Sequence, residues 1–119
     1  MFGPGTKSGA LLLRDPPGPH YLFWGDTHIR VAISYDLRNF TVVNENFISP
    51  RSAMFDSKLV EAGPLPLLLS DGNYIFFHNS ADNNNAYHAE YVILNGTDPS
   101  APYLQRAEVF FLLRFFFAV

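Results

Sequence analysis

Turn-forming sequences recur at short intervals along this chain, and their spacing is the strongest constraint on its fold. The stretches DPPGPH, GDTH, DLRNF, SPRS, SDGN, ADNNN and NGTDPS are rich in the Gly, Pro, Asp, Asn and Ser residues typical of turns. Short runs rich in Leu, Ile, Val, Tyr and Phe lie between them, and no stretch keeps the apolar period of a helix. The pattern predicts an all-β domain of short antiparallel strands.

One pattern of strand, turn and strand occurs twice. Residues 10–26 (ALLLRDPPGPHYLFWGD) and 66–82 (PLLLSDGNYIFFHNSAD) each hold an apolar triplet, an Asp in a turn and an aromatic strand that opens on Tyr. The corresponding residues are Tyr21 and Tyr74, and Phe23 and Phe76. Their lag of about 53 residues is the size of one four-stranded propeller blade. We therefore expect an incomplete β-propeller domain with blade-like units at about 8–50 and 58–110. A small β-sandwich with an accidental internal likeness is the alternative.

The composition excludes several classes of partner and site. The 119 residues are 48% hydrophobic, which suffices for one small core. Their net charge is -3, and the sequence has no block of basic residues that could neutralise phosphates, so we expect no nucleic-acid partner. The chain has no Cys, and neither His28 nor His88 has metal-ligand spacing to a partner, so we expect no metal site. No signal peptide is visible, but acceptor sequons for glycosylation begin at Asn39 and Asn95. The location therefore stays open between cytoplasmic and secreted.

The last stretch, VFFLLRFFFAV (109–119), is atypical because it is almost wholly apolar. Its 11 residues are too few to cross a bilayer, which takes roughly 20, so we expect no membrane partner. The stretch is either a core strand or the foreign or truncated end of a chain that normally continues. Two blades without neighbours also leave strand edges unpaired, which predicts self-association.

Three motifs follow one another in a fixed order. An I-x-x-A-x-S-x-D-L strand and turn is formed by Ile29, Ala32, Ser34, Asp36 and Leu37. A glycine entry, a P-x-x-x-x-D-G hairpin and an aromatic strand ending in His follow, at Gly63, Pro66, Asp71, Gly72 and His78. An L-x-x-x-D-P turn and an Arg close the series, at Leu94, Asp98, Pro99 and Arg106. With TKSGALLL before them, these motifs resemble the later blades of the five-bladed β-propeller enzymes of glycoside hydrolase family 130. The resemblance covers roughly residues 5–108.

The resemblance implies a glycosidase or glycoside phosphorylase that acts on β-mannosides or related oligosaccharides. It implies an oligosaccharide as the partner and no cofactor, with inorganic phosphate as co-substrate in a phosphorylase. In the family the proton donor is an Asp on an earlier blade, and no Asp of this chain matches it. We therefore expect a fragment or truncated form that is not catalytic alone, which leaves enzymatic activity open. The alternatives are a non-catalytic carbohydrate-binding β-domain and a structural β-domain.

The resemblance also implies particular site residues. His78 is expected to face the cleft and, with Lys7, to bind phosphate or a sugar hydroxyl. Lys58 lies near a second family lysine but one residue out of register. Glu61 stands where phosphorylases usually have a small residue, so it would repel phosphate and orient a water instead, which favours a hydrolase. No catalytic residue other than this possible water-orienting Glu61 is expected.

The residues themselves leave both a functional and a structural interpretation open. Strand alternation places Phe76 and His78 on one face, and a His at a strand end either holds an anion or sugar hydroxyl or is a satisfied structural residue. Trp24 either stacks on a sugar face or belongs to the core. Asp56 and Asp82 either accept sugar hydroxyls or form Asx turns. Lys7 is either a ligand or a solvated surface lysine.

Overall fold

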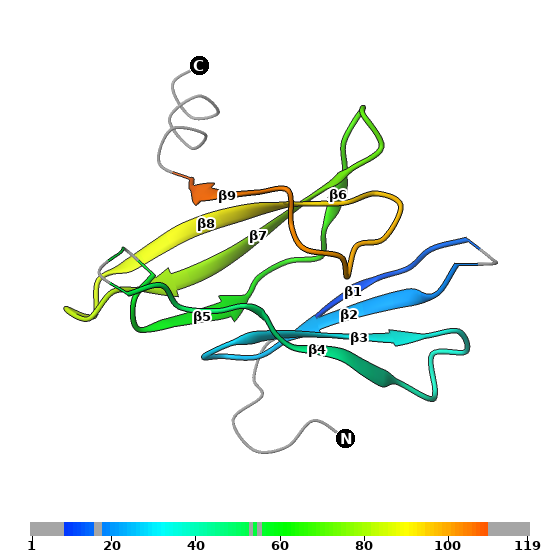
Figure 1. Cartoon of the computed structure of the whole chain (residues 1–119), viewed down its shortest axis with the longest axis horizontal. Coiled ribbons are helices and arrows are strands. Elements are labelled where there is room, and N and C mark those ends of the chain that lie inside the picture. Colours follow the sequence, from blue (N-terminus) through cyan, green and yellow to red (C-terminus); the bar gives the residue numbers. More distant parts are fainter. Residues whose placement is uncertain (1–8, 16–17, 53, 55, 110–119) are drawn as a thin grey trace.

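Every regular element in the part of the chain that the structure describes is a β-strand. The computed structural model describes residues 9–15, 18–52, 54 and 56–109 (Figure 1). Within these residues no segment is helical, and so none forms a helix that could cross a membrane. The predicted all-β class is therefore confirmed. The expectations for Lys7 and for residues 110–119 fall outside the described residues.

The first sheet, sheet 1, is an antiparallel meander of four strands. Its strands are β1 (Gly9–Leu12), β2 (His20–Trp24), β3 (Ile29–Ser34) and β4 (Thr41–Ile48), and they pair in chain order. The turn between β2 and β3 requires Gly25, which has a φ of 133°; a Cβ there would lie 1.9 Å from the His28 carbonyl oxygen. Each of the other connections coincides with one of the turn-forming sequences.

The second sheet, sheet 2, has five strands. They are β5 (Leu59–Ala62), β6 (Leu67–Leu68), β7 (Tyr74–Ala81), β8 (Tyr87–Leu94) and β9 (Gln105–Glu108). The antiparallel path runs β5-β7-β8-β9, and β6 pairs with the first residues of β7. In Figure 1 the hairpin that contains β6 projects beyond the rest of sheet 2. Sheet 2 therefore repeats the four-stranded path of sheet 1 with one short hairpin added.

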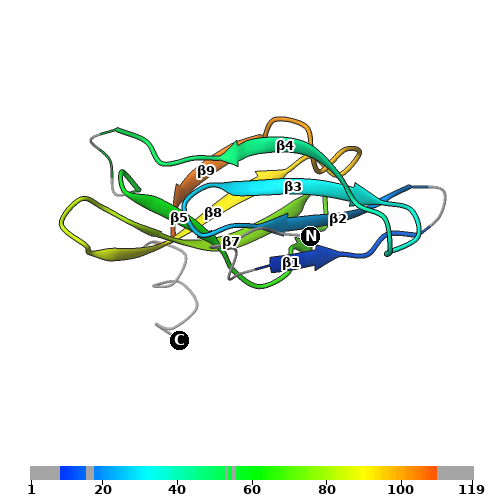
Figure 2. The same cartoon turned by 90° about the horizontal axis from the view of Figure 1, so that it is seen from below.

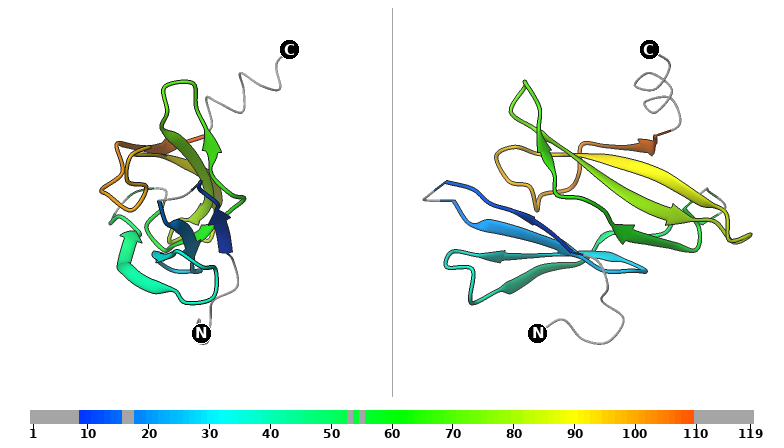
Figure 3. Two further views of the ribbon diagram at one scale, coloured as in Figure 1. Left: turned by 90° about the vertical axis from the view of Figure 1, so that its right-hand side faces the viewer. Right: turned by 180° about the vertical axis from the view of Figure 1, so that it is seen from behind.

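The two sheets lie against each other (Figures 2 and 3). Apolar side chains from both sheets form one buried core. Phe23 on β2 lies at the centre, with its ring centroid 5.1 Å from that of Phe76 on β7 and 5.9 Å from that of Phe47 on β4. The first strand of sheet 2 also binds sheet 1 directly, because the amide of Ala62 donates to the carbonyl of Gly25 at 3.2 Å. The shared core is thus the interface between the sheets.

Candidate functional site

Two of the predicted site residues, Asp56 and His78, lie in one buried group of charged side chains that come from sheet 2 and from the connection between the sheets. We call this group the ionic cluster; its members are Arg51, Asp56, His78, Glu90 and Arg106. The side chains of Asp56, His78 and Glu90 have 0% exposure, and that of Arg106 has 3%. Only Arg51, at 30%, reaches the surface within this group. The ionic cluster therefore has almost no contact with solvent.

The connection between the sheets carries Asp56 into the ionic cluster. A turn closes there, because the amide of Arg51 donates to the Asp56 carbonyl at 3.2 Å. The Asp56 carboxylate accepts hydrogen bonds through Oδ2 from Arg51 Nε at 2.8 Å and from Arg106 Nη2 at 2.7 Å. Burial raises the pKa of Asp56, but hydrogen bonding to Arg51 and the charge of Arg106 outweigh it and hold that pKa below its usual range.

Strand pairing places Glu90 beside His78. The two residues lie directly opposite each other on β7 and β8, so their side chains project to the same face. His78 Nε2 is 3.0 Å from Glu90 Oε1, although the angle of this contact is not that of a hydrogen bond. Arg106 on β9 donates from Nε to the same oxygen at 2.7 Å. The end of β7 is therefore polar because charged groups of β8, β9 and the connection between the sheets meet there.

Arg106 is the centre of the ionic cluster because it binds both carboxylates. Burial lowers its pKa, but the hydrogen bond to Tyr103 and the charges of Glu90 and Asp56 more than reverse this effect, so the pKa is raised. The guanidinium also lies over the Tyr103 ring, with Cζ 5.9 Å from the centroid. Two guanidinium groups thus balance two carboxylates, which is the condition for keeping such charges buried.

The other predicted site residues lie apart from the ionic cluster. Trp24 is 6% exposed at the end of β2, and Glu61 is half-buried on β5, opposite Asn79. The exposed Lys58 donates from its ammonium group to the side chain of Asn85 in the turn between β7 and β8. Glu61, Lys58 and Asp82, the last with a side chain that is 22% exposed, are therefore the described candidates that reach solvent.

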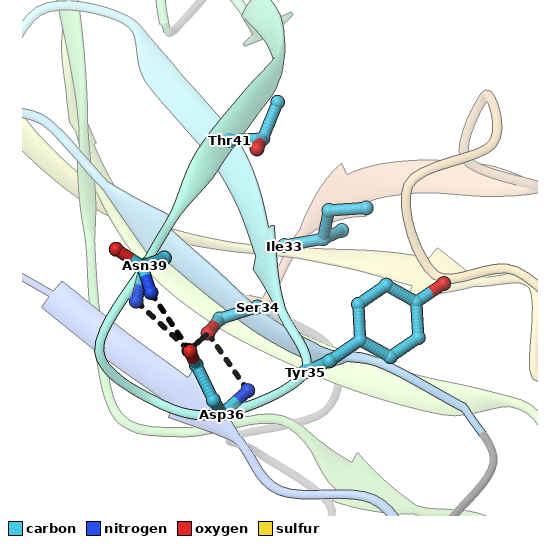
Figure 4. A pocket seen from close by; sticks show the side chains of 6 residues that line it. All are labelled: Ile33, Ser34, Tyr35, Asp36, Asn39 and Thr41. Carbon is cyan, nitrogen blue, oxygen red and sulfur yellow. Dashed lines mark hydrogen bonds between the residues drawn. The ribbon is translucent and has the colours of Figure 1, made fainter.

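The S-x-D part of the first motif builds a turn and lines a small open pocket between β3 and β4 (Figure 4). The pocket has a volume of about 260 Å³ and is lined by Ile33, Ser34, Tyr35, Asp36, Asn39 and Thr41. The amides of Asn39 and Arg38 donate to the Asp36 carboxylate at 2.8 and 2.9 Å, and these bonds hold the pKa of Asp36 far below its usual range. Ser34 also donates to Asp36, at 3.0 Å. The carboxylate is thus engaged in the turn itself.

Comparison with known proteins gives a match among solved structures. No family model and no curated protein sequence matches the chain. One structure comes from the GH130 family of mannoside phosphorylases, a family described as containing glycoside hydrolases that target β-1,2-mannosidic linkages in Candida mannan. It aligns with 87% of this chain at 27% identity and a TM-score of 0.73. This chain is similar to part of a glycoside hydrolase family 130 enzyme. The aligned part is 35% of the solved chain, so this chain spans about a third of the length of the structure it matches.

Two further solved structures match over a similar extent. A glycosyl hydrolase from Bacteroides ovatus is 26% identical over 87% of this chain and 35% of its own, with a TM-score of 0.72. The β-1,2-mannobiose phosphorylase from Listeria innocua aligns with 90% of this chain and 31% of its own, with a TM-score of 0.77 at 24% identity, which supports the fold. The prediction of a partial β-propeller is confirmed by these matches, with the two sheets as its blades.

Arg51 and Glu90 are the two members of the ionic cluster that were not predicted from the sequence. Arg106 was noted only through the closing motif of the family 130 resemblance. Glu90 had a usable signal: it alternates with Val92 and Leu94 on the buried face of β8, and an acid at such a position needs a buried partner. Arg51 follows Pro50 in a connection without strand periodicity, so no comparable signal marks it. Of the two alternatives for Asp82, the Asx turn forms, since its carboxylate accepts the amides of Asn84 and Ala86.

Proposed function

We propose that this chain supplies two adjacent blades of a β-propeller glycosidase or glycoside phosphorylase that acts on β-mannosides or related oligosaccharides. The observation that carries the proposal is the alignment of 87% of the chain, at 27% identity, with a family 130 structure. The blade pairing and the ordered motifs along it support the same conclusion. Inorganic phosphate is the co-substrate if the enzyme is a phosphorylase.

Within these blades we propose different roles for the predicted site residues. The side chains of His78 and Asp56 have 0% exposure. Further blades packed against this chain could only bury its surface more, so these two side chains would have no access to a ligand in this arrangement. The charge of Asp56 is already neutralised by Arg51 and Arg106, and His78 lies beside the carboxylate of Glu90. We therefore assign both residues to holding the two blades in place. Glu61 and Lys58 remain for contact with a ligand, since their side chains reach solvent.

The experiment transfers the blades into a complete enzyme. Residues 9–109 replace the aligned third of the Listeria innocua β-1,2-mannobiose phosphorylase, and cleavage of β-1,2-mannobiose is measured with and without phosphate. We expect cleavage by the chimera, because the remaining blades supply the proton donor. A chimera that melts cooperatively but neither cleaves nor binds mannobiose contradicts the proposal.

A second candidate function is carbohydrate binding without catalysis. The observation in its favour is that no Asp of this chain matches the proton donor that glycoside cleavage requires. Binding of β-1,2-mannobiose by the 119-residue chain, combined with an inactive chimera, supports this alternative. An active chimera supports the enzyme.

A further inference from the structure

A histidine bridges two carboxylates at the outer end of sheet 2. His88 Nδ1 lies 2.6 Å from Glu108 Oε2, and its Nε2 lies 3.1 Å from Asp82 Oδ2. The three side chains are 24%, 37% and 22% exposed, respectively, so they form a group at the surface. Neither the ionic cluster nor the proposed function uses these residues.

Each ring nitrogen of His88 faces a carboxylate oxygen. A carboxylate accepts hydrogen bonds, so both nitrogens must carry a proton for both contacts to be favourable, and this is the imidazolium form. The hydrogen bonds with Asp82 and Glu108 accordingly raise the pKa of His88. The bond from His88 and the amide of Ala86 lower the pKa of Asp82, so both groups favour their charged forms.

The two carboxylates belong to different elements. Asp82 is fixed in the turn between β7 and β8, where it accepts the amides of Asn84 and Ala86 at 2.9 and 3.0 Å. Glu108 is the last residue of β9, which runs along the outer side of β8 (Figure 1). The next amide, that of Val109, still donates to the Ala89 carbonyl at 2.9 Å. His88 therefore ties the end of β9 to the turn.

We propose that His88 is a pH-sensitive latch, which holds the end of β9 to the turn between β7 and β8 as an imidazolium and releases one carboxylate when it loses a proton. Among the residues that the structure describes, the charged groups seen to face it are Asp82 from the turn and Glu108 from β9. Two residues along β8, Glu90 is bound to Arg106. From β7 the residue opposite is the uncharged Ser80, and the nearby Lys58 is directed to Asn85.

Release of the latch acts on the interface between the blades. Arg106 lies two residues before Glu108 on the same short strand, and β9 carries Arg106 to Asp56 and Glu90. Loosening the end of β9 therefore loosens the strand that delivers the central cation of the ionic cluster. This inference goes beyond the proposed function and does not depend on it.

The direction of the effect follows from the raised pKa of His88. The latch is fully closed below the ordinary histidine pKa of 6.5 and opens as the pH rises through the higher pKa of the folded state. The strand end is consequently held more firmly in mildly acidic than in alkaline solution.

The test uses the complete chain and mass spectrometry, which tolerates association. Deuterium exchange at the C2 hydrogen of each histidine ring gives its titration midpoint, and amide exchange reports the peptide that contains Val109. We expect the His88 midpoint to lie above the ordinary histidine value and to fall in both Asp82→Asn and Glu108→Gln. We also expect amide exchange at Val109, corrected for intrinsic pH dependence, to rise about two- to fivefold across that midpoint, as for a partly exposed ion pair.

Two variants separate the latch from a general pH effect. His88→Gln is expected to abolish the pH step at Val109, whereas His28→Gln, at a histidine that bonds Ser49, is expected to retain it. An ordinary midpoint for His88, or a pH step that persists in His88→Gln, overturns the proposal. If His88→Gln does not fold, Glu108→Gln decides the same question. In that variant, a His88 titration midpoint and a pH step at Val109 that are both unchanged also overturn the proposal.

Discussion

Phe23 and Phe76, which occupy equivalent positions in the two sequence repeats, contact each other across the interface, with ring centroids 5.1 Å apart. Both side chains are fully buried. The preceding equivalent pair, Tyr21 and Tyr74, is bridged by Arg14, whose Cζ lies 5.8 and 5.9 Å from the two ring centroids. Positions that match along the sequence thus meet in space, because each lies on the second strand of its blade and faces the other blade.

This contact predicts a large loss of stability for Phe76→Ala. The substitution removes a fully buried ring at the centre of the interface, so we expect the free energy of unfolding to fall by about 3–5 kcal/mol. Thermal and urea denaturation measure the loss. The matched control is Phe77→Ala, on the opposite face of β7 and only half-buried, which should cost clearly less. Equal losses in the two variants contradict the interface assignment.

The ionic cluster predicts an equally strong effect for Glu90→Ala. Removal of this carboxylate leaves the guanidinium groups of Arg106 and Arg51 with Asp56 as their remaining carboxylate in the ionic cluster, so one buried positive charge is uncompensated, which costs about 3–5 kcal/mol of folding free energy. Glu45→Ala is the control, because its pair with Arg30 is exposed, at 69% for Glu45, and should cost less than about 1 kcal/mol. Chemical denaturation of both variants gives the comparison, and similar small losses argue against a structural role for the ionic cluster.

The lowered pKa of Asp56 predicts acid sensitivity. A carboxylate with a depressed folded-state pKa contributes stability above its ordinary pKa of 3.8, and this contribution is lost as the pH falls through the folded-state value. We expect Asp56→Asn to be less stable than the natural chain at pH 7 and the difference to narrow below pH 3.8. Denaturation midpoints at several pH values measure it. A difference that stays constant with pH shows that the ionised carboxylate is not the source.

The exposed leucines predict self-association of the isolated chain. Leu67 and Leu68 on β6 are 55% and 67% exposed, and Leu65 beside them is 55% exposed. Together with unpaired strand edges, this apolar surface should make the chain oligomeric or aggregated. Sedimentation velocity should show larger species, reduced in the double variant Leu67→Lys and Leu68→Lys. A compact monomer with cooperative melting contradicts the expectation.

The role proposed for Glu61 can be tested by asking which reaction the chimera performs. If its carboxylate orients a water, cleavage of mannobiose by the chimera needs no phosphate, and Glu61→Gln lowers the rate by about 100-fold or more. Glu45→Gln, at an exposed acid on β4, is the control and should leave the rate unchanged. Cleavage that depends on phosphate and is insensitive to Glu61→Gln assigns the enzyme to the phosphorylases instead.

The sequence by itself determined the strands, the turns and the presence of two similar units. These features follow from local signals: Gly25 permits a turn that a side chain blocks, Asp71 and Gly72 mark a hairpin, and alternation along residues 74–78 sets the buried face. The match between Tyr21 and Tyr74 also predicted the size of one blade. Each signal lies within a few residues, so it is readable without tertiary contacts.

Only the tertiary structure decided what the polar end of β7 does. His78 was compatible with binding an anion or with a structural role, and its surroundings come from residues that are distant in the chain: Asp56 from the connection between the sheets, Glu90 from β8 and Arg106 from β9. Burial of these charges is favourable only when all partners converge, and that convergence depends on how the two blades pack. Local sequence carries no information on this packing, because the energy of each charge is set by neighbours up to 50 residues away.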